Sequence, residues 1–239
     1  MPAAAKSPEY VRRFRGIKAL NFVLCIVIFF LGLTAFQYKA AYEGSALSCL
    51  REMTVDGTIF SSLVALICAV MSVLEFIKGD TIHLRALYYL RLSSVVTGLI
   101  ILLVVLIGYL PFVPANPVIA RYDMINMHVL VPLLTMLSFC FNDTPHGKLS
   151  VKQRLGGLLF LLIYTIGIES FIISGIVPVE KIPYFFLDIL HQPLWLTLFA
   201  IWFIYTLGFL SSWLFSELNR KLYTVWYRGV NEKSDTAAV

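Results

Sequence analysis

The stretch MINMHVLVPLLTMLSFCF, residues 124–141, is apolar almost throughout and is long enough to cross a bilayer as a helix. His128 lies about one turn from its start, and Pro132 follows four residues later. An ionisable side chain within such a segment is costly, so it usually faces a polar cavity or a partner. The partner of His128 is therefore the central question that this sequence raises.

Composition places the whole chain in a membrane. Of its 239 residues, 59% are hydrophobic and 14% are charged, and the mean hydropathy is +0.82. A soluble domain carries about 25% charged residues. The net charge of +5 does not indicate nucleic acid, because the Lys and Arg residues lie between apolar runs, where they act as topology signals. The four cysteines form no CxxC pair, so neither a disulfide framework nor a zinc knuckle is indicated.

Six apolar runs of about 20 residues predict an all-α, polytopic membrane protein. Runs of this length match helices, whereas barrel strands need about 9–11 residues. We expect a basic N-terminal segment at 1–16, a six-helix transmembrane domain at 17–216 and a basic, polar tail at 217–239. The segment 177–193 is amphipathic and aromatic and is expected to lie at the interface. The runs are at about 17–36, 57–77, 86–112, 124–141, 155–177 and 193–215.

The distribution of positive charge predicts the orientation. Fifteen Lys and Arg residues lie on the side of the two termini and the even loops, against four in the odd loops. This bias predicts that both termini are cytoplasmic. The membrane is expected to be a bacterial inner membrane or a eukaryotic plasma or endoplasmic reticulum membrane.

This topology places Thr58 and His128 in one layer. Both lie near the start of a helix that enters from the outer face, within roughly 10 Å of the outer interface at 1.5 Å per residue. A histidine beside a hydroxyl can act as general base while the hydroxyl attacks a carbonyl. The alternative is structural, with Thr58 capping its helix and His128 bonded to a carbonyl or to Asn126. Further polar side chains are expected in the same outer region, namely Ser61, Ser62, Asn126, Glu169, Tyr184 and Asp188.

Other polar residues lie within or near the ends of the predicted spans. Glu75 and Arg91 both lie near the inner ends of their helices and are predicted to form a structural ion pair or to extend to the interface. Glu169 stands deeper, as a proton-coupling acid or a hydrogen-bonded one. The histidines have no HExxH or equivalent spacing, so no metal site is expected.

Four stretches, in order, resemble the androgen-induced protein family of six-helix membrane proteins, and particularly its bacterial relatives. The first and third resemble the threonine and histidine motifs of the family, the second the opening of its third helix, and the fourth the turn before its last helix. They are 58–64 (TIFSSLV), 90–96 (LRLSSVV), 127–132 (MHVLVP) and 182–188 (IPYFFLD).

The resemblance implies a threonine hydrolase that cleaves fatty acid esters of hydroxy fatty acids, with the nucleophile at Thr58 and the base at His128. Ser61, Ser62 or Asn126 would be candidates for oxyanion donors. We therefore expect an integral membrane lipid esterase that needs no cofactor and whose partners are membrane lipids and a lipid ester. The alternative is a non-catalytic membrane protein, either a small transporter or a lipid-binding scaffold. The sequence does not define an oligomeric state.

Overall fold

The computed structural model describes residues 8–109, 121–145 and 147–236, and within these ranges the protein is all-α. Six of its helices are long and apolar enough to cross a membrane. The predicted all-α, polytopic fold is therefore confirmed. Residues 1–7 of the expected N-terminal segment, and residues 237–239 of the tail, lie outside the described ranges.

Three of the six spans are interrupted by other helical geometry. The third consists of α4 (Arg85–Leu103) and the π-helical η1 (Val104–Tyr109). The fourth consists of α5 (Tyr122–Ile125), the π-helical η3 (Asn126–Leu130) and α6 (Val131–Asn142). The fifth consists of α7 (Val151–Arg154), the 3₁₀ turn η4 (Leu155–Leu158) and α8 (Leu159–Ile173). The other elements are α1 (Pro8–Glu43), α2 (Ala46–Cys49), α3 (Met53–Lys78), the 3₁₀ turns η5 (Val179–Lys181) and η6 (Phe185–Leu187), and α9 (Leu194–Thr236).

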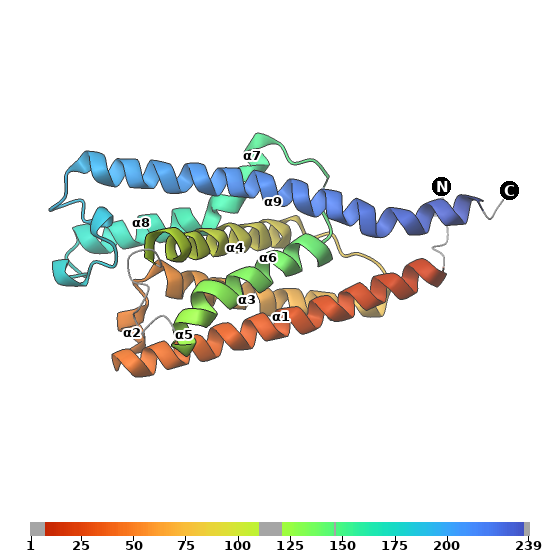
Figure 1. Cartoon of the computed structure of the whole chain (residues 1–239), viewed down its shortest axis with the longest axis horizontal. Helices are drawn as coiled ribbons and strands as arrows, with labels where there is room; N and C mark the ends of the chain where they lie inside the picture. The colour runs from red at the N-terminus through yellow and green to blue at the C-terminus, as the bar shows by residue number, and fades with distance from the viewer. Residues whose placement is uncertain (1–7, 110–120, 146, 237–239) are drawn as a thin grey trace.

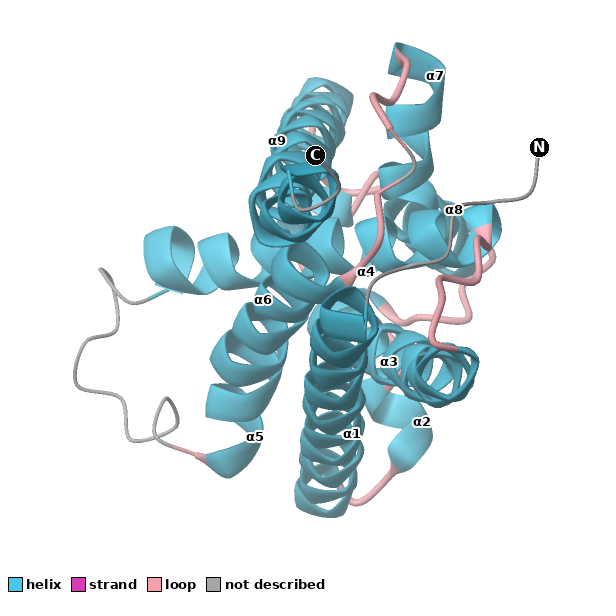
Figure 2. Ribbon diagram, turned by 90° about the vertical axis from the view of Figure 1, so that its right-hand side faces the viewer, coloured by secondary structure: helices cyan, strands magenta, loops and turns pink. Residues whose placement is uncertain are grey.

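The bundle is built around α4, which contacts α3, α6, α8 and α9. Helix α1 packs along α3 and also contacts α6, so α1, α3 and α6 form one side of the bundle, as the end-on view in Figure 2 shows. Helix α9 covers the other side with α8. The central position of α4 agrees with its burial, since two thirds of the residues in its apolar segment are buried inside the bundle.

The two ends of the bundle differ in charge. Helix α1 begins and α9 ends at one end, which we call the basic end, and α2 lies at the opposite end, which we call the α2 end (Figure 1). Gly79 ends α3 at the basic end in a left-handed conformation (φ +70°), and its N–H donates to the Glu75 carbonyl. Six spans return the chain to its starting side, as the positive-charge bias predicts.

Two elements are longer than expected. Helix α1 already begins at Pro8, within the segment expected to precede the first span, and α9 continues to Thr236 without a break at residue 216. The polar residues at these two helix ends are compatible with an α-helix, so both helices extend beyond the apolar runs that predicted them. The segment 177–193 contains η5 and η6, and it lies between the fifth and sixth spans.

Candidate functional site

His128 lies in the π-helical turn η3, and Pro132, four residues later, causes this helical geometry. Pro132 has no N–H, and its ring would clash with the carbonyl four residues earlier, which belongs to His128. The turn before it therefore widens, and the Val131 N–H donates to the Asn126 carbonyl five residues back. π-Bulges of this kind are frequent at functional sites.

Thr58 lies in the first half of α3, where this helix packs closely against Gly32 of α1. Its side chain is 1% exposed. The approach depends on Gly32 of α1, because a Cβ at that position would overlap the Ser62 hydroxyl and lie 3.2 Å from Cγ2 of Thr58. Thr58 is thus enclosed at a helix–helix contact near the α2 end.

His128 lies beside the same part of α1. On one side of it in sequence, the Tyr122 hydroxyl lies 2.8 Å from Oγ1 of Thr34. On the other side, Val131 shares a buried cluster with Ile28. His128 falls between these two contacts and is 9% exposed. It therefore lies at the depth of α1 residues between 28 and 34.

Thr58, which meets Gly32, and His128 thus share one layer of the bundle, and η3 contacts both α1 and α3. Their present hydrogen bonds do not join them. The Thr58 hydroxyl donates to the Thr54 carbonyl over 2.7 Å, and Nδ1 of His128 lies 2.9 Å from the Met124 carbonyl oxygen. A carbonyl only accepts, so Nδ1 carries the proton and Nε2 has the free lone pair that a base needs.

The nearby hydroxyls point in different directions. Ser62 donates to the Thr58 carbonyl over 2.8 Å, whereas Ser61 faces α4 and accepts a hydrogen bond from Ser94 at 3.0 Å. Asn126 is 2% exposed and lies in η3 with His128. Of the three expected oxyanion donors, Ser62 and Asn126 therefore adjoin the Thr58 and His128 layer most directly, and Ser61 connects α3 to α4 instead.

An apolar cavity lies one helical turn from Thr58, at the α2 end. Its volume is about 70 Å³, and it is enclosed by side chains of α3, α4, α8, α9 and the segment around η6. Thr54 lines it, and so does Tyr184, whose side chain is in hydrogen-bonding contact with Thr54. Burial raises the pKa of Tyr184. The phenol is therefore neutral and can close the cavity without introducing a charge.

The remaining outer residues lie apart from this layer. Asp188 is buried, and its Oδ1 lies 2.8 Å from Nδ1 of His191, so it anchors the turn before α9. Glu169 of α8 has no hydrogen-bond partner for either carboxylate oxygen among the described residues. Within the described residues, no hydrogen bond or ion pair joins either of them to Thr58 or His128.

The predicted ion pair between Glu75 and Arg91 is wrong, because each residue pairs with a different partner. Oε2 of Glu75 lies 2.9 Å from Nζ of Lys18 on α1, and Nε of Arg91 lies 2.9 Å from Oδ2 of Asp143. Lys18 was expected to act as a topology signal, but its side chain is 2% exposed. The depth of a residue does not determine which helix its side chain faces, and for this reason the partners were missed.

Buried polar side chains extend from the Arg91 ion pair across to α1 and α3. Arg91 also donates to the Ser138 hydroxyl, Ser138 donates to Oδ1 of Asn21 over 2.7 Å, and Nδ2 of Asn21 donates to Ser72 over 2.9 Å. The network therefore connects α1, α3, α4 and α6 at the basic end. A single polar residue per helix carries little sequence signal, so the network was not predicted.

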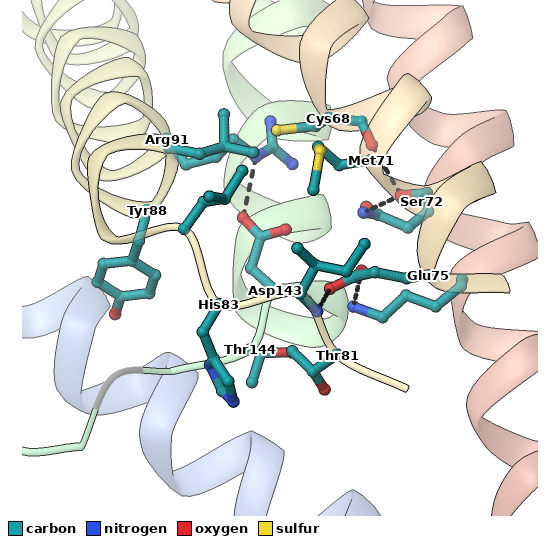
Figure 3. Close-up of a pocket in the computed structure, with 15 residues that line it drawn as sticks. Cys68, Met71, Ser72, Glu75, Thr81, His83, Tyr88, Arg91, Asp143 and Thr144 are labelled. Atoms are coloured by element: carbon teal, nitrogen blue, oxygen red, sulfur yellow. Dashed lines mark hydrogen bonds and ion pairs between the residues drawn. The ribbon is translucent and has the colours of Figure 1, made fainter. Parts of the chain in front are cut away.

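A cavity of about 60 Å³ opens beside this network (Figure 3). Glu75, Arg91 and Asp143 line it together with His83 and Thr81 from the connection between α3 and α4. It has room for a few water molecules, at roughly 10–15 Å³ for each. Its two cations, Lys18 and Arg91, face the carboxylates of Glu75 and Asp143, so the formal charges of these four side chains balance.

In the described part of the chain, no three His, Cys, Asp or Glu side chains are grouped as they would be around a metal ion. Comparison with family models, with curated proteins and with solved structures finds no match for this chain. The function must therefore be argued from the geometry of the residues.

Proposed function

We propose that the chain is an integral membrane esterase that cleaves fatty-acyl esters, with Thr58 as nucleophile and His128 as general base. The observation that carries the proposal is the shared layer. A buried hydroxyl and a buried imidazole lie at the same depth of α1, on adjacent helices, one turn from an enclosed apolar cavity.

The tautomer of His128 favours the role of base. Because Nδ1 is held by the Met124 carbonyl, Nε2 takes the proton of Thr58 as its Oγ1 attacks the ester carbonyl. The imidazolium then returns this proton to the departing alcohol, which leaves an acyl-threonine. Water, deprotonated by the same nitrogen, releases the fatty acid and restores the hydroxyl. No cofactor takes part in these steps.

The hydroxyl must first leave its present partner. Breaking the neutral hydrogen bond from Thr58 to the Thr54 carbonyl costs about 1 kcal/mol, which is small beside a catalytic barrier. The apolar cavity then accounts for the substrate class, because burial contributes about 0.8 kcal/mol for each methylene. Fatty acid esters of hydroxy fatty acids are one class of lipid ester that such a site would take.

Fluorophosphonate labelling tests the nucleophile. Wild type, Thr58→Ala, His128→Ala and the control Thr135→Ala would be purified in mild detergent and compared at equal monodispersity. Thr135 is also a fully buried threonine within a span. We expect labelling and lipid-ester hydrolysis to be lost in the first two variants and kept in the control. Labelling that persists in Thr58→Ala, or well-folded wild type that neither labels nor hydrolyses any ester, would contradict the proposal.

A lipid-binding scaffold is the second candidate. It is favoured by the engagement of the Thr58 hydroxyl within its own helix, which is also how a structural threonine behaves. In that case the same cavity would hold an acyl chain without cleaving it. Saturable binding of an intact ester, with no product formed, would identify this function.

A further inference from the structure

A second concave site lies at the basic end, far from Thr58 along the bundle. It is a groove of about 460 Å³ between α9 and the region of α7. Lys148, Arg154, Arg220 and Lys221 line it, and Glu217 is the one carboxylate among its lining residues. Four cationic side chains against one carboxylate leave three unmatched positive charges in one groove.

The Glu217 carboxylate already forms ion pairs with two of the four cations. Oε1 of Glu217 lies 3.0 Å from Nη2 of Arg154, and Oε2 lies 2.7 Å from Nη2 of Arg220. Lys148 and Lys221 are exposed and form no ion pair within the part of the chain that the structure describes. The groove therefore has hydrogen-bond donors and positive charge to offer a ligand.

The other lining residues are apolar, and along α9 they precede the cations Arg220 and Lys221. Trp213, Leu214 and Leu218 line the groove with 47%, 50% and 38% of their surfaces exposed. Helix α9 runs toward the basic end, so these residues lie nearer the middle of the membrane than Lys221. Trp213 and Lys221 are separated by about 12 Å at 1.5 Å per residue. The groove is thus apolar on the side nearer the middle of the membrane and cationic on the side nearer the basic end of the bundle.

The walls of the groove are held in place by hydrogen bonds. The Ser212 hydroxyl donates to the Arg154 carbonyl over 2.7 Å, and Nδ2 of Asn219 donates to the Asp143 carbonyl over 2.8 Å. Ser150 and Gln153 form a capping box that begins α7. The cations are therefore presented by a preformed site.

We propose that this groove binds a phospholipid with an anionic headgroup. Its phosphate lies among Lys148, Arg220 and Lys221, and its acyl chains extend along Trp213 and Leu214. The order of the two zones is the order of headgroup and chain in a lipid, and three unmatched cations favour a headgroup with net negative charge. A tryptophan at the boundary matches the position that this residue prefers at membrane interfaces.

Titration with a short-chain lipid tests the proposal. The full chain in uncharged detergent would be titrated with dioctanoyl phosphatidylglycerol, and bound lipid would be counted by native mass spectrometry. We expect saturable binding of one lipid, weakened by added salt, and at least about tenfold tighter than binding of dioctanoyl phosphatidylcholine.

Two matched double variants locate the site. Lys148→Glu with Lys221→Glu should weaken binding by about tenfold or more, because it reverses two exposed, unpaired cations of the groove. Arg12→Glu with Arg13→Glu makes the same charge change on the exposed surface of α1 at the same end and should leave affinity within about twofold. Thr58→Ala should bind as wild type does, whether or not the esterase proposal holds.

Three outcomes would overturn the proposal. Equal affinity for the two lipids would remove the role of headgroup charge. Equal weakening by the two double variants would show an effect of net charge alone. Binding of glycerol 3-phosphate as tightly as the lipid would show that the apolar half of the groove contributes nothing and that the groove takes free phosphate esters.

Discussion

Arg91 and Asp143, which are 52 residues apart in sequence, form a buried ion pair between α4 and the residue that follows α6, with Nε 2.9 Å from Oδ2. The guanidinium is 1% exposed and also donates to Ser138. Asp143 is 13% exposed. The two charges depend on each other, because Arg91 alone would be left fully buried and unpaired, and Asp143 alone would be left largely buried and unpaired.

We therefore predict that Arg91→Ala destabilises the protein by about 3 kcal/mol. The matched control is Arg13→Ala, whose cation is half exposed and lies 4.0 Å from Glu9 within α1. That change should cost less than about 1 kcal/mol, because solvent screens exposed pairs. Unfolding by SDS, followed by tryptophan fluorescence in mixed micelles, measures both variants. Equal midpoints for the two would show that the buried pair does not stabilise the bundle.

The close approach of α1 to α3 predicts a second effect on stability. Gly32→Ala should destabilise the protein by about 1–3 kcal/mol, because the new methyl group overlaps the Ser62 hydroxyl. Adding Ser62→Ala removes that hydroxyl and should recover part of the loss. Gly16→Ala is the control, since a Cβ there meets nothing within 4 Å. The same SDS titration applies, and a Gly32 variant as stable as the Gly16 variant would contradict this packing.

Because of the apolar cavity at the α2 end, we predict that the rate of ester hydrolysis depends on acyl-chain length. Ile204 of α9 lines the cavity, so Ile204→Trp should fill it. Hydrolysis of a long-chain ester should fall by about tenfold or more, because several methylenes lose their burial at about 0.8 kcal/mol each. Hydrolysis of an acetate ester should change little. The ratio of kcat/KM for the two esters is the measurement, and an unchanged ratio would place the acyl chain elsewhere.

We predict that the Cys49 thiol is protected from chemical modification in the folded protein. Its side chain is 0% exposed, its Sγ donates to the Ser45 carbonyl over 3.4 Å, and burial raises its pKa. A raised pKa lowers the thiolate fraction at every pH below it, so maleimide addition should be slow at pH 7 to 8 and should accelerate as pH rises. Mass spectrometry of native and SDS-unfolded protein would report the adduct. A cysteine introduced by Ala46→Cys, on the exposed surface of α2, provides the fast reference, and equal rates at the two positions would show that Cys49 is open to solvent.

Several features of the protein follow from the sequence alone. Long apolar runs such as 124–141 predict spanning helices, because only a helix satisfies every backbone N–H and C=O within one segment in lipid. The charge bias predicts the common side of the two ends. The same topology placed Thr58 and His128 near one depth, and the contacts of α1 agree with this, since depth depends only on the distance along a helix from its end.

The partners of the polar side chains were decided by the tertiary structure. Arg91 and Glu75 share a depth, yet they pair with Asp143 and Lys18, because the rotation of each helix and its neighbours determine what a side chain faces. The position of a residue within its apolar run gives its depth along the membrane normal. A charge that is buried at that depth requires a partner of opposite charge. Only packing decides with which residue it pairs.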